Sequence, residues 1–204
     1  VLRRFTYTET DPLAQYDKLL SAYTVAEWSE PLFNNRALFS DYYLKERLPG
    51  EPEWQEPRTA IFRELQGLIA PARQRLASAT EATTRAGLIE PVLDALGFTW
   101  IERRKPDESG DEPDYVLYAR DDDRPLAVCL AYVWNRYLDG VDATRDPTTP
   151  DENPGAQVIT LLERGEAPYA IVTNGKTWRL YAAGAHSRAT NYYEIDLEET
   201  IASP

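Results

Sequence analysis

The sequence predicts an α/β core preceded by a helical subdomain, and three observations support this prediction. Apolar residues in the first 80 of the 204 positions recur at the spacing of amphipathic helices. From position 81 onward, short apolar runs typical of strands alternate with helical patterns. Apolar residues make up 43% of the chain, which is enough to bury one sizeable core with a subdomain attached. We therefore expect a helical arm or subdomain over residues 1–80 and an α/β core over residues 81–204.

The helical subdomain is predicted from three apolar patterns. Apolar residues recur every three to four positions over residues 13–23 and again over 38–48, where Pro49-Gly50 ends the pattern. A third helix is expected over residues 59–77.

The α/β core is expected to begin with a capped amphipathic helix. Thr80 is a favourable N-cap residue, the apolar positions continue to Leu96, and Gly97 is the residue type that often ends a helix. The Asn174-Gly175 pair between two apolar runs favours a hairpin, because both residues tolerate positive φ. The elements expected after the first helix are strands over 98–102, 114–118 and 126–134, a loop over 139–154, a helix over 156–164, and strands over 169–173, 177–182 and 192–197.

Composition narrows the class of protein. No segment approaches the ~18 uninterrupted apolar residues of a membrane span, so we expect no membrane association. The single cysteine, Cys129, lies within an apolar run and is expected to be a small buried residue. Without a disulfide framework or a signal segment at the start, we expect a reducing, cytoplasmic location. The chain begins with Val1 and ends shortly after an apolar strand, as a piece of a longer protein would. His186, the only histidine, has no Ser, Cys or Asp pattern around it, so we expect no triad or zinc site there.

The net charge of −12 is concentrated in the expected core. Residues 1–80 contain 10 basic and 11 acidic residues, a net charge of −1, whereas residues 81–204 contain 12 and 23, a net charge of −11. Affinity for DNA depends mainly on neutralising phosphate charge. We therefore expect that this chain does not hold DNA by itself.

Six phrases of the sequence, in the same order, resemble a known family. They are LFSDYYLKERLP (38–49), GLIEPVLDALGF (87–98), PDYVLY (113–118), NPGAQVITLL (153–162), IVTNGKTWRLY (171–181) and YYEIDL (192–197). They are similar to the N-terminal nuclease portion of single-chain type IIG restriction-modification enzymes, which join a PD-(D/E)xK nuclease domain to an adenine methyltransferase and a DNA-recognition domain. The resemblance covers most of residues 36–197 and implies a restriction-endonuclease-like core. The expected order of helix, three strands, helix and strand agrees with that core.

The resemblance also implies a site. In this family two or three carboxylates hold Mg²⁺, and a lysine orients or activates the attacking water. Asp114 matches the aspartate of the PD motif, Glu81 matches the helix-borne glutamate, and Gln157 matches a glutamine beside the catalytic residues. The remaining acid and lysine correspond to Leu130 and Tyr132 within the phrase CLAYVW.

The two replacements remove chemistry that the family requires. Leucine has no ligand atom for a cation, and tyrosine, with a pKa near ~10, supplies neither a positive charge nor a ready base at neutral pH. Each such electrostatic element is typically worth ~10² to 10³ in rate. We therefore expect an inactive remnant site in which Asp114 and Glu81 bind Mg²⁺ weakly or not at all. We also expect the side chains of Asp114 and Leu130, on adjacent strands, to converge near Glu81.

Simpler interpretations of these residues stay open. Asp114 also suits the start of a strand after proline, and Glu81 also suits the first turn of a helix, where an acid favours the macrodipole. Gln157 could be a solvated helix residue. Leu130 and Tyr132 could be ordinary strand residues of a protein that was never a nuclease.

The leading hypothesis is a catalytically degenerate nuclease-like domain of a restriction-modification or phage-defence methyltransferase system. It would act as a scaffold or regulatory module on DNA that is held by methyltransferase and target-recognition domains in the same or a partner chain. The aromatic residues Trp28, Trp54 and Trp134 are candidate contact surfaces.

Two alternatives remain. The chain could be an active Mg²⁺-dependent endonuclease whose missing groups are supplied by migrated acids such as Glu112 or Asp139. It could instead be a standalone acidic domain that binds a basic protein surface by imitating the charge of DNA. The acidic residues within 121–123 and 142–152 motivate that second alternative.

Overall fold

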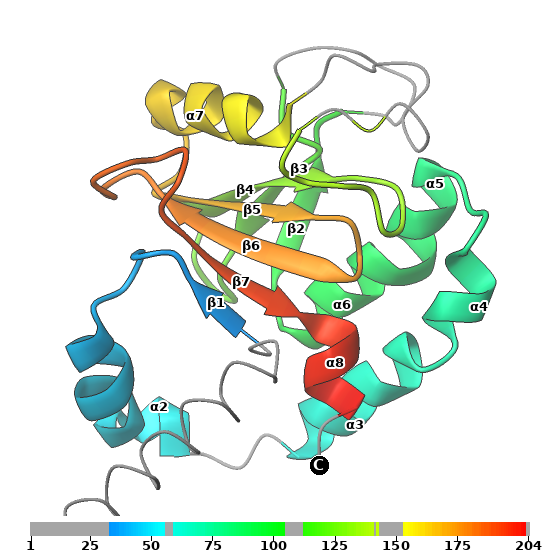
Figure 1. The fold of residues 1–204 in the computed structure, drawn as a ribbon, viewed down its shortest axis with the longest axis horizontal. Coiled ribbons are helices and arrows are strands. Elements are labelled where there is room, and N and C mark those ends of the chain that lie inside the picture. The colour runs from blue at the N-terminus through cyan, green and yellow to red at the C-terminus, as the bar shows by residue number, and fades with distance from the viewer. Residues whose placement is uncertain (1–32, 56–58, 105–111, 141, 143–152, 203–204) are drawn as a thin grey trace, which may run out of the picture. The chain divides into compact units, whose positions relative to one another are not determined.

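The computed structural model of the chain describes residues 33–55, 59–104, 112–140, 142 and 153–202. Residues 33–204 form one compact unit. The unit is built on a single mixed sheet with helices packed on it (Figure 1). The fold is therefore of the α/β class that the sequence predicts. No helix within the described ranges is both long and apolar enough to cross a membrane.

The sheet has seven strands in the order β1-β7-β6-β5-β4-β3-β2. Neighbouring strands are antiparallel except for β4 and β5, which are parallel. A parallel pair needs a long crossover connection, and helix α7 lies within that connection. The strands are β1 (Phe33–Asn35), β2 (Thr99–Glu102), β3 (Tyr115–Tyr118), β4 (Pro125–Ala131), β5 (Tyr169–Thr173), β6 (Thr177–Ala182) and β7 (Tyr192–Asp196).

Helices cover both faces of the sheet (Figure 1). Helix α7 (Pro154–Arg164) lies on one face. A continuous helical segment lies on the other and consists of α5 (Glu81–Thr84), a π-helical turn (Arg85–Ile89) and α6 (Glu90–Ala95). The other helical elements of the described ranges are a π-helical turn (Tyr43–Arg47), a 3₁₀ turn (Leu48–Gly50), α2 (Pro52–Gln55), α3 (Thr59–Ile69), α4 (Ala72–Leu76) and α8 (Leu197–Ala202).

Strand β4 directs alternate side chains to the two faces. Leu130 lies in a core cluster with Val158 of α7, whereas Cys129 and Ala131 lie in a cluster with Ile89 of the π-helical turn. Cys129 is completely buried, as the sequence predicts, and burial raises the pKa of its thiol. A cysteine in this environment behaves as a small apolar residue.

Most core elements occur close to where the sequence predicts them. Thr80 caps α5 by accepting an N–H hydrogen bond of 3.2 Å within the first turn. Gly97 ends the helical segment with a φ of 84°. Strand β4 is shorter than expected and ends at Ala131. Beyond it the chain approaches α5, where the Trp134 amide donates to Thr84 Oγ1 at 3.1 Å.

The hairpin between β5 and β6 is confirmed, but its turn differs from the expected one. Residues 174–176 connect the strands, and only Gly175 has a positive φ, of 82°. The Asn174 side chain accepts hydrogen bonds from the amides of Lys176 at 3.0 Å and Thr177 at 2.7 Å. Asn174 therefore stabilises the turn through its side chain rather than through a left-handed backbone.

The compact unit begins before the core that the sequence predicts over 81–204. Strand β1 pairs with β7, and α3 and α4 contribute residues such as Leu65 and Leu76 to a core cluster that includes Trp134. Residues before and after position 81 therefore bury apolar side chains in one shared core. Trp134 is 4% exposed, so its expected role as a contact surface is wrong. The helix expected over 13–23 and Trp28 lie outside the described residues.

Candidate functional site

Asp114 is the buried centre of the candidate site. It lies directly before β3, and its side chain is 0% exposed. One carboxylate oxygen accepts hydrogen bonds from Arg104 Nε at 2.9 Å and from Arg85 Nη1 at 3.3 Å. The other accepts one from the Ala131 amide at 2.6 Å. Burial raises the pKa of Asp114, whereas the contacts with the two guanidiniums favour the ionised carboxylate.

Arg85 connects Asp114 to two further carboxylates. Its Nη1 lies 3.4 Å from Glu81 Oε1, and its Nη2 lies 3.1 Å from Glu102 Oε1. The guanidinium also packs on Tyr115, with its central carbon 4.7 Å from the ring centroid, and Nε donates to Tyr115 Oη at 2.8 Å. Arg85 therefore contacts a carboxylate of α5, one of β2 and one directly before β3, while its own side chain is only 2% exposed.

The helix that carries Arg85 changes geometry at this residue. The π-helical turn begins at Arg85, and within that turn Arg85, Leu88 and Ile89 are all buried. A π-helical turn inserts extra length into a helix and re-aims the side chains at that point. As a result, the helix presents one cation together with apolar side chains to the same side of the sheet.

Glu81 lies at the rim of the site, with a side chain that is 28% exposed. Burial raises the pKa of Glu81 to about 7, and the charge of Asp114 adds to this rise, whereas Arg85 opposes it. Glu81 therefore gains and loses its proton near neutral pH.

Leu130, Tyr132 and Gln157 lie on the α7 face of the sheet. Leu130 is 2% exposed within the core cluster under α7. Tyr132 Oη donates to Gln157 Oε1 at 2.6 Å. The expected convergence of Leu130 with Asp114 near Glu81 is wrong. Asp114 lies one residue before β3, where its carboxylate contacts Arg85, whereas the position of Leu130 within β4 directs it to the α7 face.

The acids that could have replaced the missing groups have partners elsewhere. Arg164 Nη1 lies 3.5 Å from Glu112 Oε1. Asp139 accepts hydrogen bonds from both terminal nitrogens of Arg179, at 2.7 and 3.0 Å. No contact brings Glu112 or Asp139 to Asp114 within the described part of the chain. Most of the acidic stretch over 142–152 lies outside that part.

Sequence reasoning missed three members of the network, which are Arg85, Arg104 and Glu102. Only one signal pointed to any of them. Glu81 and Arg85 are four residues apart in a helical pattern, which is the spacing of an ion pair on one helix face. Glu102 ends β2 and Arg104 follows it, and they reach Arg85 and Asp114 only through tertiary folding.

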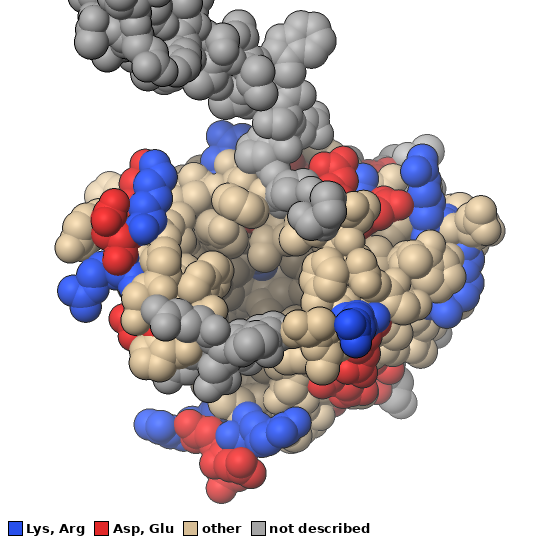
Figure 2. Space-filling view, turned by 90° about the horizontal axis from the view of Figure 1, so that it is seen from below, with Lys and Arg blue, Asp and Glu red and all other residues tan. Residues whose placement is uncertain are grey.

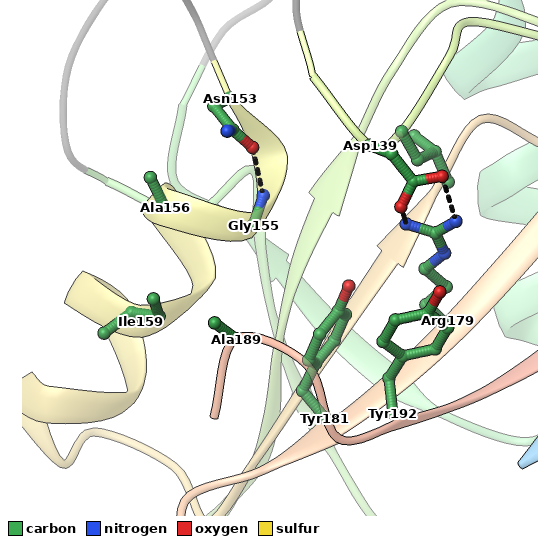
Figure 3. Close-up of a pocket in the computed structure, with 10 residues that line it drawn as sticks. Asp139, Asn153, Gly155, Ala156, Ile159, Arg179, Tyr181, Ala189 and Tyr192 are labelled. Carbon is green, nitrogen blue, oxygen red and sulfur yellow. Dashed lines mark hydrogen bonds and ion pairs between the residues drawn. The ribbon is translucent and has the colours of Figure 1, made fainter. Parts of the chain in front are cut away.

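A pocket of about 300 Å³ lies beside Arg179 (Figure 3). The hydroxyl groups of Tyr181 and Tyr192 and the N-terminus of α7 line it. Arg179 pairs with Asp139 and Glu194, and the Gly155 amide at the N-terminus of α7 donates to Asn153 Oδ1 at 3.0 Å. The paired arginine gives this pocket no free cation for an anionic ligand.

The residues at the candidate site do not fit Mg²⁺, which requires several hard oxygen ligands in octahedral geometry. One oxygen of Asp114 accepts hydrogen bonds from both Arg85 and Arg104, and the other accepts one from the Ala131 amide. Among the residues that the structure describes, no group of three or more His, Cys, Asp or Glu side chains is spaced to hold a metal ion. The arrangement is a closed ion-pair network rather than an open ligand set.

Comparison with protein-family models, with curated proteins and with solved structures finds no match for this chain.

Proposed function

We propose that this chain is a catalytically inactive nuclease-like domain that acts as a scaffold or regulatory module in a restriction-modification or phage-defence methyltransferase system. The observation that supports inactivity is the environment of Asp114. Its carboxylate is fully buried and accepts hydrogen bonds from Arg104, Arg85 and the Ala131 amide. A metal-dependent nuclease needs this carboxylate to be available to a cation.

The energetic argument favours an inactive site. A metal ion at Asp114 would have to separate the carboxylate from two guanidiniums that are themselves 2% and 8% exposed. Leaving buried charges without their partner costs about 3–5 kcal/mol. Leu130 offers no ligand atom that could offset that cost.

The distribution of basic residues supports indirect contact with DNA. Four arginines, Arg85, Arg104, Arg136 and Arg179, are buried, with 1–7% of the whole residue exposed. Their charges are therefore directed into the protein and not toward a nucleic acid. On the face shown in Figure 2, basic side chains are interspersed with acidic ones. We infer that DNA is held by methyltransferase and target-recognition domains in the same or a partner chain.

Cleavage of DNA by the complete protein that contains this domain tests the inactivity. With Mg²⁺ or Mn²⁺ present, we expect no cleavage above that of a protein-free control. Glu81→Gln is the matched variant, because Glu81 is the more accessible of the two expected metal ligands, Asp114 and Glu81, and glutamine keeps its size. Metal-dependent cleavage that disappears in Glu81→Gln would show that the domain is a working nuclease.

Removal of the domain tests the scaffold role. We expect DNA methylation by the complete protein to fall when residues 33–204 are deleted, while binding of the methyl donor remains. Unchanged methylation and unchanged DNA affinity after the deletion would contradict a scaffold or regulatory role.

A further inference from the structure

Three carboxylates from separate elements meet at one guanidinium in this domain. Glu81 belongs to α5, Glu102 ends β2 and Asp114 precedes β3, and an oxygen of each lies 3.1–3.4 Å from a terminal nitrogen of Arg85. Three converging carboxylates are a ligand set typical of a divalent cation. Here the positive charge comes from a side chain.

We propose that Arg85 is an internal cation that holds Glu81, Glu102 and Asp114 together and excludes divalent metal ions from them. Arg85 is fixed for this purpose by its contact with the Tyr115 ring and by the hydrogen bond of 2.8 Å from Nε to Tyr115 Oη. The inference goes beyond the function proposed above, because it holds whether or not the domain works beside a methyltransferase.

The negative charge of the three carboxylates favours a cation at the position of the Arg85 guanidinium. When all three carboxylates are ionised they carry −3, and Arg85 and Arg104 together carry +2, which leaves −1. Without Arg85 the same ionised cluster would carry −2 around the buried Asp114. Coulomb attraction for a divalent ion rises with that charge and with the low dielectric of the interior.

The spacing of the carboxylates explains why their oxygens are not placed at metal-ligand distances in the native cluster. A planar guanidinium is wider than a metal ion, and its contacts at 3.1–3.4 Å hold the oxygens farther apart than ligands at about 2.1–2.6 Å from a cation. Glu81 and Glu102 have side chains that are 28% and 46% exposed, so both can swing inward if the guanidinium is removed. Asp114 would stay in place, because Arg104 and the Ala131 amide still hold it, and the oxygen that accepts from Arg85 would have one acceptor position free for a metal ion.

Thermal unfolding of an Arg85→Met variant of this chain in the presence of Mn²⁺ tests the inference. Methionine keeps an unbranched apolar stem and removes the charge. We expect the Tm of the variant to rise by about 3–6 °C at a Mn²⁺ concentration ten times its Kd, since metal binding to the folded state adds stability by mass action. The Tm of the wild type should not respond to Mn²⁺.

Two control variants separate the site from general effects of charge. Arg85→Met combined with Asp114→Asn should lose the response to Mn²⁺, because the fixed ligand is gone. Arg124→Met removes an exposed arginine that pairs with Asp122, and it should behave like the wild type.

A second variant, Arg85→Gln, covers the case in which Arg85→Met does not fold without metal. For each variant, cooperative unfolding that appears or strengthens only with Mn²⁺ supports the proposal. If neither variant gains stability or structure from Mn²⁺ at concentrations up to about 10 mM, roughly ten times the Kd of the weakest calcium sites of proteins, the proposal is overturned. DNA cleavage by the complete protein would contradict the proposed function without bearing on this test.

Discussion

Asp114 and Arg104 form an ion pair in which both partners are almost completely removed from water, at 0% and 8% side-chain exposure. In such a pair the attraction between the charges offsets a large desolvation cost. Replacing both partners by apolar residues therefore changes the stability little, whereas removing one partner alone lowers it strongly. The same reasoning applies to Arg85, whose 2% exposure leaves it dependent on the carboxylates around it.

We predict that Asp114→Asn lowers the free energy of unfolding by about 3 kcal/mol or more, because two buried guanidiniums lose their common counter-ion. Chemical denaturation with urea measures the change. Asp122→Asn is the matched control, since Asp122 pairs with Arg124 at the surface and its replacement should leave stability nearly unchanged. Equal effects of the two substitutions would contradict the structural role of Asp114.

We predict that Glu81 makes stability depend on pH between about 4.5 and 7. The pKa of Glu81 rises from 4.5 to about 7 on folding, so in this range the folded state binds more protons than the unfolded state. Stability therefore falls as pH rises from 4.5 to 7 and then becomes constant. Urea unfolding of wild type and Glu81→Gln at pH 5 and pH 8 should show the wild type losing on the order of 1–3 kcal/mol relative to the variant. A difference of the opposite sign would mean that Arg85, and not burial, governs this carboxyl.

At the scale of elements, the β5–β6 turn fixes the end of the sheet against the helical segment. A Cβ atom at Gly175 would lie 3.0 Å from Leu88 Cδ2 and 3.1 Å from Trp134 Cε3. The turn, the π-helical turn and the residues after β4 therefore meet at a point that only glycine can occupy without movement.

We predict that Gly175→Ala destabilises the fold more than Gly165→Ala does. Both glycines have positive φ, of 82° and 72°, so both substitutions strain the backbone. Only Gly175 also has close neighbours, since nothing lies within 4 Å of a Cβ at Gly165. Urea unfolding should show an additional loss of about 1–3 kcal/mol for Gly175→Ala, the usual cost of overpacking. Equal losses would indicate that Leu88 moves aside freely.

For the molecule as a whole, the negative net charge and the burial of four arginines both lower the affinity for DNA. The chain carries −12, and the exposures of Arg85, Arg104, Arg136 and Arg179 of 1–7% leave their charge inside the protein. An acidic exterior opposes the approach of phosphates, because nucleic-acid affinity depends on exposed cations.

We predict that this chain alone binds duplex DNA with a Kd weaker than ~10⁻⁵ M at physiological salt, within or below the range of non-specific binding. Fluorescence anisotropy of a labelled duplex measures it. Sub-micromolar binding would contradict the inference that other domains hold the DNA.

The sequence by itself determined the α/β class, most of the strands and the helix that begins after Thr80, because apolar periodicity and capping are local properties of the chain. It also marked Asp114 and Glu81 as residues to examine. Only the tertiary structure decided that Leu130 faces α7, that residues before position 81 join the core, and that Arg85 and Arg104 pair with Asp114. These outcomes depend on contacts between residues that are distant in sequence, including the contacts of two guanidiniums with a buried carboxylate. A local sequence pattern does not encode such contacts.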